Sequence, residues 1–156
     1  MPPQAAGTEA GTNYCSCQRM ADAILFKTNA AAGGRNRGMN VKGKKILIIG
    51  TGKSGLAAAR LLLAVKAVPV LFDWNEKTDP EEVRKKLPEE AEVKILVGEL
   101  PQEELEEISL AVFSPGVPVD TPFADRIREQ GIPICGEVEL GYAFLKGRLI
   151  AITGTN

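Results

Sequence analysis

A short aliphatic run followed by three closely spaced glycines constrains this chain more than any other feature. Residues from Ile46 to Ile49 are continuously apolar, which is typical of a strand buried on both faces of a parallel sheet. Gly50, Gly52 and Gly55 follow at the G-x-G-x-x-G spacing, in which glycines permit a tight turn and bring a helix close to the strand. The stretch therefore predicts a strand, a turn and a helix.

This turn is a candidate phosphate-binding loop. Free N–H groups at the start of the following helix and the positive end of its dipole attract an anion. Lys53 adds a point charge that can meet a phosphate. Gly52-Lys53-Ser54 is not a Walker A loop, because that spacing requires a glycine where the chain has Leu47. The alternative for the motif is a strand-to-helix turn that binds nothing.

A second strand favours nucleotide binding. The run from Val68 to Phe72 ends in Asp73, 23 residues after Gly50, where an acid commonly accepts a hydrogen bond from the ribose or base of a nucleotide. Pro69 has no N–H for a strand ladder, so we expect it at the first position of this strand. The helix expected between the two strands, over residues 56–68, carries only two charges and should be covered on most sides.

Composition and charge indicate one globular domain and exclude several functions. At 156 residues and 44% hydrophobic content, the chain has room for about one domain with a core. Its 19 basic and 20 acidic side chains give a net charge of -1, which provides no attraction to nucleic acid or an anionic membrane. Three cysteines and no histidine exclude the usual zinc sites and histidine-based catalysis within this chain.

Residues 1–38 differ from the rest of the chain. They are rich in Ala, Gly, Asn and Thr without apolar periodicity, and we expect a disordered extension. The apolar patch over residues 21–26 is too short and too polar for a signal-peptide core or a membrane span. Cys15 and Cys17 are interpreted as ordinary thiols, because they have no further metal ligands nearby in the sequence.

The remaining segments alternate between strand and helix patterns, which predicts an α/β fold with a doubly wound parallel sheet, Rossmann-like, over residues 39–148. Asp79-Pro80 and Thr121-Pro122 each combine a capping side chain with a proline at the first helical position. The second of these helices should end at Gly131. The expected strands are 93–97, 110–113 and 132–135, and the expected helices are 79–87, 101–108, 121–131 and 136–145.

A rigid turn, Ser114-Pro115-Gly116-Val117-Pro118, follows the strand expected over residues 110–113. Ligands of open α/β sheets bind at this carboxyl edge of the strands. Taken alone, the turn is equally a binding segment or a plain connection.

The end of the sequence resembles the start of a second nucleotide site. Residues 149–153 form a sixth strand-like run, and Gly154-Thr155-Asn156 follow it as the front of a phosphate loop. No lysine or helix follows here to complete such a loop.

Together, these segments resemble one enzyme family. I-G-T-G-K-S-G, the strand end at Asp73, F-S-P-G-V-P, G-I-P-I-C-G-E-V-E-L and A-I-T-G-T-N are similar, in this order, to the start of the D-glutamate-adding Mur ligases. The resemblance covers residues 39–156. It implies a cytoplasmic bacterial enzyme of peptidoglycan precursor synthesis, with a UDP-sugar-binding Rossmann-like domain, a central ATPase domain and a third domain that recruits D-glutamate. Residues 149–156 would then be the first strand and loop of the central domain.

The resemblance also implies residue roles. The ligand would be UDP-N-acetylmuramoyl-L-alanine, while ATP and Mg²⁺ would serve the full-length enzymes and not this chain alone. No catalytic residue or metal ligand is expected here, so the chain alone is expected to be inactive. The implied UDP-sugar contacts are Gly50, Gly52, Lys53, Ser54 and Gly55 at the pyrophosphate loop, Asp73, Trp74 and Asn75 near the uracil, and Ser114, Pro115 and Gly116 along the nucleoside; the implied ATP contacts are Gly154, Thr155 and Asn156.

Two other interpretations stay open at this point. The glycine pattern and Asp73 fit the NAD(P)-binding domain of an oxidoreductase equally well. A non-catalytic regulatory fragment that retains the fold is the third interpretation.

Overall fold

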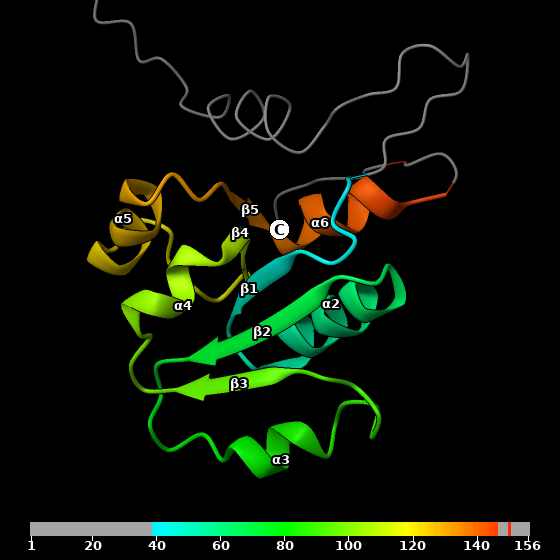
Figure 1. Cartoon of the computed structure of the whole chain (residues 1–156), viewed down its shortest axis with the longest axis horizontal. Coiled ribbons are helices and arrows are strands. Elements are labelled where there is room, and N and C mark those ends of the chain that lie inside the picture. Colours follow the sequence, from blue (N-terminus) through cyan, green and yellow to red (C-terminus); the bar gives the residue numbers. More distant parts are fainter. Residues whose placement is uncertain (1–38, 147–149, 151–156) are drawn as a thin grey trace, which may run out of the picture.

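Five parallel strands form one sheet in the part of the chain that the computed structural model describes, residues 39–146 and 150. The strand order is β3-β2-β1-β4-β5 (Figure 1). The chain order therefore reverses beside β1, as the predicted doubly wound fold requires. The strands are β1 (Lys45–Ile49), β2 (Val68–Asp73), β3 (Lys94–Val97), β4 (Ile108–Phe113) and β5 (Ile134–Gly136).

Helices cover both faces of the sheet, and β1 contributes side chains to both layers. Ile46 and Ile48 pack with one group of helices, whereas Leu47 and Ile49 pack with the other. All four side chains have an exposed fraction of 0%, which confirms the interpretation of the aliphatic run as a doubly buried strand. The first layer holds α2 (Lys53–Ala64), α3 (Pro80–Arg84) and α6 (Glu137–Phe144), and the second holds α4 (Gln102–Glu106) and α5 (Pro122–Glu129).

Both predicted proline-containing helix starts are confirmed. The Asp79 carboxylate accepts a hydrogen bond from the Glu81 N–H at 2.9 Å, and the Thr121 hydroxyl accepts one from the Ala124 N–H at 3.2 Å. Gly131 follows the end of α5 with φ of +70°, as its predicted role as a helix terminator requires.

The end of α2 lies four residues before Val68, the latest residue at which the sequence allows this helix to end, and a lysine occupies the left-handed position that glycine usually takes. The helix ends at Ala64, and Lys66 adopts a left-handed φ of 62°. The Lys66 N–H donates to the Leu63 carbonyl at 3.0 Å, and the Ala67 N–H donates to the Leu62 carbonyl at 2.9 Å. This pair of bonds is the usual left-handed helix end, here without glycine.

Pro69 is the second residue of β2, not the first as expected, and it costs the sheet no hydrogen bond. The Val68 N–H donates to the Lys44 carbonyl next to β1. Successive residues of a strand face opposite neighbours, so the Pro69 nitrogen faces β3. Pairing between β2 and β3 begins only at Val70.

Other boundaries also differ from expectation by a few residues. Helix α3 ends at Arg84 and not at residue 87. Ile108, expected at the end of a helix, is the first residue of β4 and pairs with Lys45 of β1. Ile132, expected at the start of a strand, instead completes the end of α5 by donating its N–H to the Ile127 carbonyl at 3.3 Å, so β5 begins at Ile134.

Several expectations lie outside the described residues. These are the extension over residues 1–38, the domain end at residue 148 and the ATP-loop residues Gly154, Thr155 and Asn156. Of the strand expected over 149–153, only Ile150 is described, and it belongs to no strand. Within the described range, no helix has the length and apolar character needed to cross a membrane.

We predict that Lys66→Gly stabilises the protein by about 1 kcal/mol, because glycine adopts the left-handed conformation without steric cost. Urea unfolding of the purified chain measures this change. Lys85→Gly is the matched control, since Lys85 ends α3 with an ordinary φ of -57° and glycine there should destabilise by a few tenths to about 1 kcal/mol. A Lys66→Gly protein no more stable than the unmodified chain would contradict this account of the helix end.

Candidate functional site

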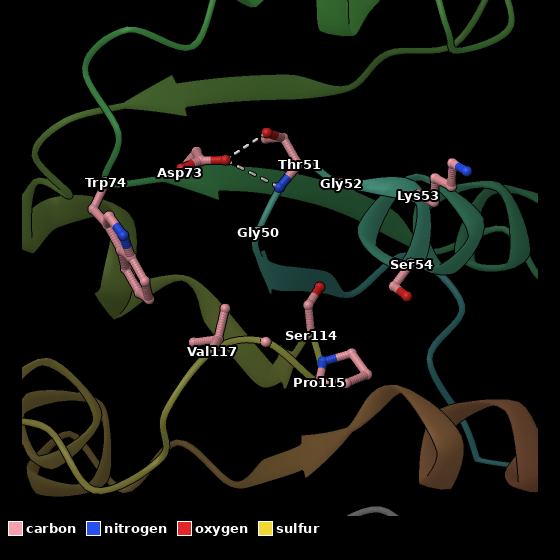
Figure 2. Close-up of a pocket in the computed structure, with 11 residues that line it drawn as sticks. Gly50, Thr51, Gly52, Lys53, Ser54, Asp73, Trp74, Ser114, Pro115 and Val117 are labelled. Atoms are coloured by element: carbon pink, nitrogen blue, oxygen red, sulfur yellow. Dashed lines mark hydrogen bonds between the residues drawn. The ribbon is translucent and has the colours of Figure 1, made fainter.

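A cleft of about 510 Å³ opens at the carboxyl ends of β1, β2 and β4 (Figure 2). This is the edge where the chain order reverses, which is the usual ligand position in open α/β sheets. Its volume lies within the range of roughly 300 to 1,000 Å³ that small-molecule sites occupy. The lining residues are Gly50, Thr51, Gly52, Lys53, Ser54, Asp73, Trp74, Ser114, Pro115, Gly116 and Val117. Nine of the eleven residues expected to contact a UDP-sugar are among them, the exceptions being Gly55 and Asn75.

Gly50 and Gly55 shape the loop between β1 and α2. Gly50 has a φ of +103°, and a Cβ there would lie 3.1 Å from the Ser114 hydroxyl oxygen. Gly55 is buried behind the cleft, and a Cβ there would lie 1.9 Å from the Gly50 carbonyl oxygen. Glycine at position 55 therefore lets the first turn of α2 lie directly against the end of β1.

Gly52 is the loop glycine that faces open space. A Cβ at this residue would meet no heavy atom within 4 Å among the described residues, apart from its chain neighbours. No packing within the described protein requires a glycine here. Its absent side chain leaves the backbone accessible from the cleft.

The first turn of α2 has features that suit an anion. Gly52 caps the helix without a side-chain hydrogen bond, and no acidic side chain lies in the first turn. The N–H groups of the first turn have no acceptor within a helix, and the dipole makes this end positive. The Ser54 side chain projects toward the Ser114-Pro115 turn, whereas the Lys53 side chain leads away from Trp74 (Figure 2).

Asp73 holds the loop to the end of β2. Its Oδ2 accepts hydrogen bonds from the Thr51 hydroxyl at 2.5 Å and from the Thr51 N–H at 3.2 Å. Its Oδ1 accepts one from the Asn75 N–H at 3.0 Å. A carboxylate offers about four acceptor positions, so three protein donors occupy most of its capacity. The sequence predicted Asp73 as a ligand contact and missed its partner Thr51.

Asn75 lies outside the cleft lining. Its backbone N–H donates to Asp73, and its side-chain oxygen accepts a hydrogen bond from the Lys77 N–H at 3.2 Å. Both bonds shape the turn that follows β2, which is a common use of asparagine. The structure therefore gives Asn75 a local role in the turn.

Trp74 and Val117 form an apolar end of the cleft. Trp74 follows the end of β2 and has an exposed fraction of 45%. Its indole extends toward Val117 (Figure 2). Val117 was not expected at the site, because the motif S-P-G-V-P by itself does not show which of its side chains turns inward. This end of the cleft suits a flat, weakly polar group.

Charge is sparse in the cleft. Lys53 and Asp73 are the charged residues among those that line it.

Lys45 and Glu107 form an ion pair at the amino-terminal edge of the sheet, away from the cleft. Their hydrogen bond raises the pKa of Lys45 and lowers the pKa of Glu107. Within residues 39–146, no cluster of three or more carboxylate, cysteine or histidine side chains could hold a metal ion.

Comparison with known protein families decides the membership of this chain. A family model described as "Mur ligase MurD-like, N-terminal domain" matches residues 44–136. The chain belongs to this MurD-like family. It is 47% identical over 118 residues to the UDP-N-acetylmuramoylalanine--D-glutamate ligase of Lachnoclostridium phytofermentans, and 44% identical over 118 residues to that of Lachnospira eligens.

Both alignments cover 76% of the MurD-like chain and 26% of the relative, so the chain spans about a quarter of the length of the curated relatives it matches. Among solved structures, SirC, a precorrin-2 dehydrogenase, shares 14% identity at a TM-score of 0.36, covering 60% of this chain and 42% of that one. Shikimate dehydrogenase from Aquifex aeolicus shares 17% identity at a TM-score of 0.40, covering 67% of this chain and 48% of that one.

We predict that Thr51→Val destabilises the MurD-like chain by about 1 kcal/mol, because it removes the hydroxyl that donates to Asp73 and keeps the side-chain shape. Thr78→Val is the control, since Thr78 lies in the turn after β2 and outside the cleft. Urea unfolding of both variants measures the difference. Equal stability of Thr51→Val and the unmodified chain would show that the Thr51–Asp73 hydrogen bond does not hold the loop.

Proposed function

We propose that this chain is the UDP-sugar-binding domain of a D-glutamate-adding Mur ligase, and that its ligand is UDP-N-acetylmuramoyl-L-alanine. The observation that carries the proposal is the start of α2, which has no side-chain cap and exposes the backbone of Gly52 where the sheet reverses its order. A diphosphate matches this position because backbone N–H groups and the helix dipole both favour an anion. The family membership of residues 44–136 supports the same ligand.

The shape of the cleft supports one orientation of the ligand. The diphosphate would lie against Gly52, Lys53 and Ser54 at the start of α2. The nucleoside would then pass the turn from Ser114 to Gly116, which faces the loop across the cleft. The uracil would lie at the apolar end near Trp74. Gly55 and Asp73 would support the loop from behind, one by its missing side chain and the other through Thr51.

The complete reaction would need more than these residues. In the proposed full-length enzyme, ATP with Mg²⁺ would activate the carboxylate of the bound sugar–alanine conjugate, and the amine of D-glutamate would form the amide bond. Gly154, Thr155 and Asn156, the residues proposed to begin the ATP loop, lie outside the described range, so no step of this chemistry is assigned to described residues. We expect the 156-residue chain by itself to bind the UDP-sugar without turning over ATP.

The alternative of an NAD(P)-binding domain has less support. Dinucleotide-binding domains use the acid at the end of the second strand to accept hydrogen bonds from ribose hydroxyls. In this chain the Asp73 carboxylate already accepts from Thr51 and Asn75. It therefore has little remaining capacity for a ribose diol.

Isothermal titration calorimetry on the purified chain tests the proposal. We predict that UDP-N-acetylmuramoyl-L-alanine binds more tightly than NADH. Asp73→Ala should weaken the binding of the UDP-sugar by about 1 to 3 kcal/mol, because the loop loses its support. Asp79→Ala is the matched control, since Asp79 also accepts a backbone hydrogen bond but caps α3 away from the cleft. Equal affinity for NADH, or an unchanged affinity in Asp73→Ala, would count against the proposal.

A further inference from the structure

Four aromatic side chains from three elements and one loop meet beside the cleft. Phe123 of α5 lies at their centre and stacks on Phe72 of β2, with a centroid distance of 5.2 Å and an interplanar angle of 15°. Trp74 meets Phe123 in a T-shaped arrangement at 6.3 Å and 75°, and Phe113 of β4 lies 6.5 Å from Phe123 at 56°. All three distances are in the range where aromatic pairs attract one another.

Trp74 is the member of this group that the solvent reaches most. Its exposed fraction is 45%, compared with 2% for Phe72 and 3% for Phe113. A single exposed aromatic residue is ordinary on a protein surface. Trp74 differs because it lines the cleft and contacts the ring of Phe123. The buried side chains of Phe72 and Phe113 in turn fix the position of that ring.

Phe123 itself belongs to a helix outside the cleft. None of the described residues that line the cleft comes from α5. The ring of Phe123 packs with the layer of buried side chains that contains Ala124 and Ile127 of the same helix. The position of the Trp74 indole therefore depends on how α5 packs against the sheet.

We propose that Phe123 is a positioning residue for nucleobase binding, which holds the Trp74 indole as the surface on which the base of the ligand stacks. The inference rests on the proposed UDP-sugar function and adds a residue outside the cleft to it. A tryptophan side chain loses rotamer freedom when a ligand stacks on it, and contact with Phe123 reduces that loss before binding. Stacking on an aromatic side chain is tolerant of base identity, so this contact contributes affinity for a planar base and none for the diphosphate.

Trp74 is the only tryptophan in the chain, so its fluorescence reports directly on this surface. The experiment is a titration of the 156-residue chain with UDP and with inorganic pyrophosphate, followed by calorimetry and by tryptophan emission. We expect UDP to change the Trp74 emission. Trp74→Ala should lower the affinity for UDP, measured by calorimetry, roughly 10-fold or more.

Phe123→Leu should lower the affinity for UDP about 2- to 10-fold and leave the affinity for pyrophosphate unchanged, because the lost aromatic pair affects only the binding of the base. Phe123→Tyr should restore the affinity for UDP, because it keeps the ring. Phe144→Leu is the matched control: Phe144 is also partly buried, but it packs on the other face of the sheet. This control should bind UDP like the unmodified chain.

Each contrary result has a distinct meaning. If Phe123→Leu binds UDP as tightly as the unmodified chain, or if its affinities for UDP and pyrophosphate fall equally, the positioning role is overturned and the proposed function stands. UDP binding without any change in Trp74 emission also overturns the inference. If the unmodified chain binds neither UDP nor the UDP-sugar, the proposed function and this inference both fail.

Discussion

The close approach of α2 to the end of β1 is the constraint on which the rest of the site depends. A side chain at Gly55 would collide with the Gly50 carbonyl oxygen, since a Cβ would lie 1.9 Å from it. Without this side chain, the first turn of the helix lies against the strand and presents its N–H groups at the cleft. No packing among the described residues requires a glycine at position 52, so its backbone is open to the cleft, where the proposed diphosphate would meet the positive end of the helix.

The sheet places two further segments around this helix start. β2 and β4 lie on either side of β1, so the turns that leave them flank the glycine loop. Asp73, at the end of β2, holds the loop through Thr51, and Ser114, at the end of β4, lies against Gly50. The cleft is thus a polar loop and helix start with an apolar end at Trp74. A UDP-sugar combines an anionic and a planar part in the same way.

Local features of the sequence were sufficient to predict most of the fold and many of the residues that line the cleft. The aliphatic run of β1 and the capping residues Asp79 and Thr121 act through close neighbours in the chain, so their roles were predictable. The hydrogen bond between Thr51 and Asp73 depends on the register of β1 against β2, and the contact between Phe123 and Trp74 depends on where α5 packs. Neither follows from sequence spacing. The left-handed Lys66 was missed because lysine carries no signal for that conformation.

We propose that the start of α2 binds the diphosphate of a UDP-sugar. Backbone amide chemical shifts from ¹⁵N-labelled protein, recorded by NMR while UDP-N-acetylmuramoyl-L-alanine is added, test it most directly. We predict the largest shifts at the amides of Gly52, Lys53, Ser54 and Gly55, accompanied by shifts at Ser114 and Gly116, and none at the opposite edge near Glu107. Saturable binding with unshifted amides in the first turn of α2, or with the largest shifts elsewhere on the sheet, would contradict it.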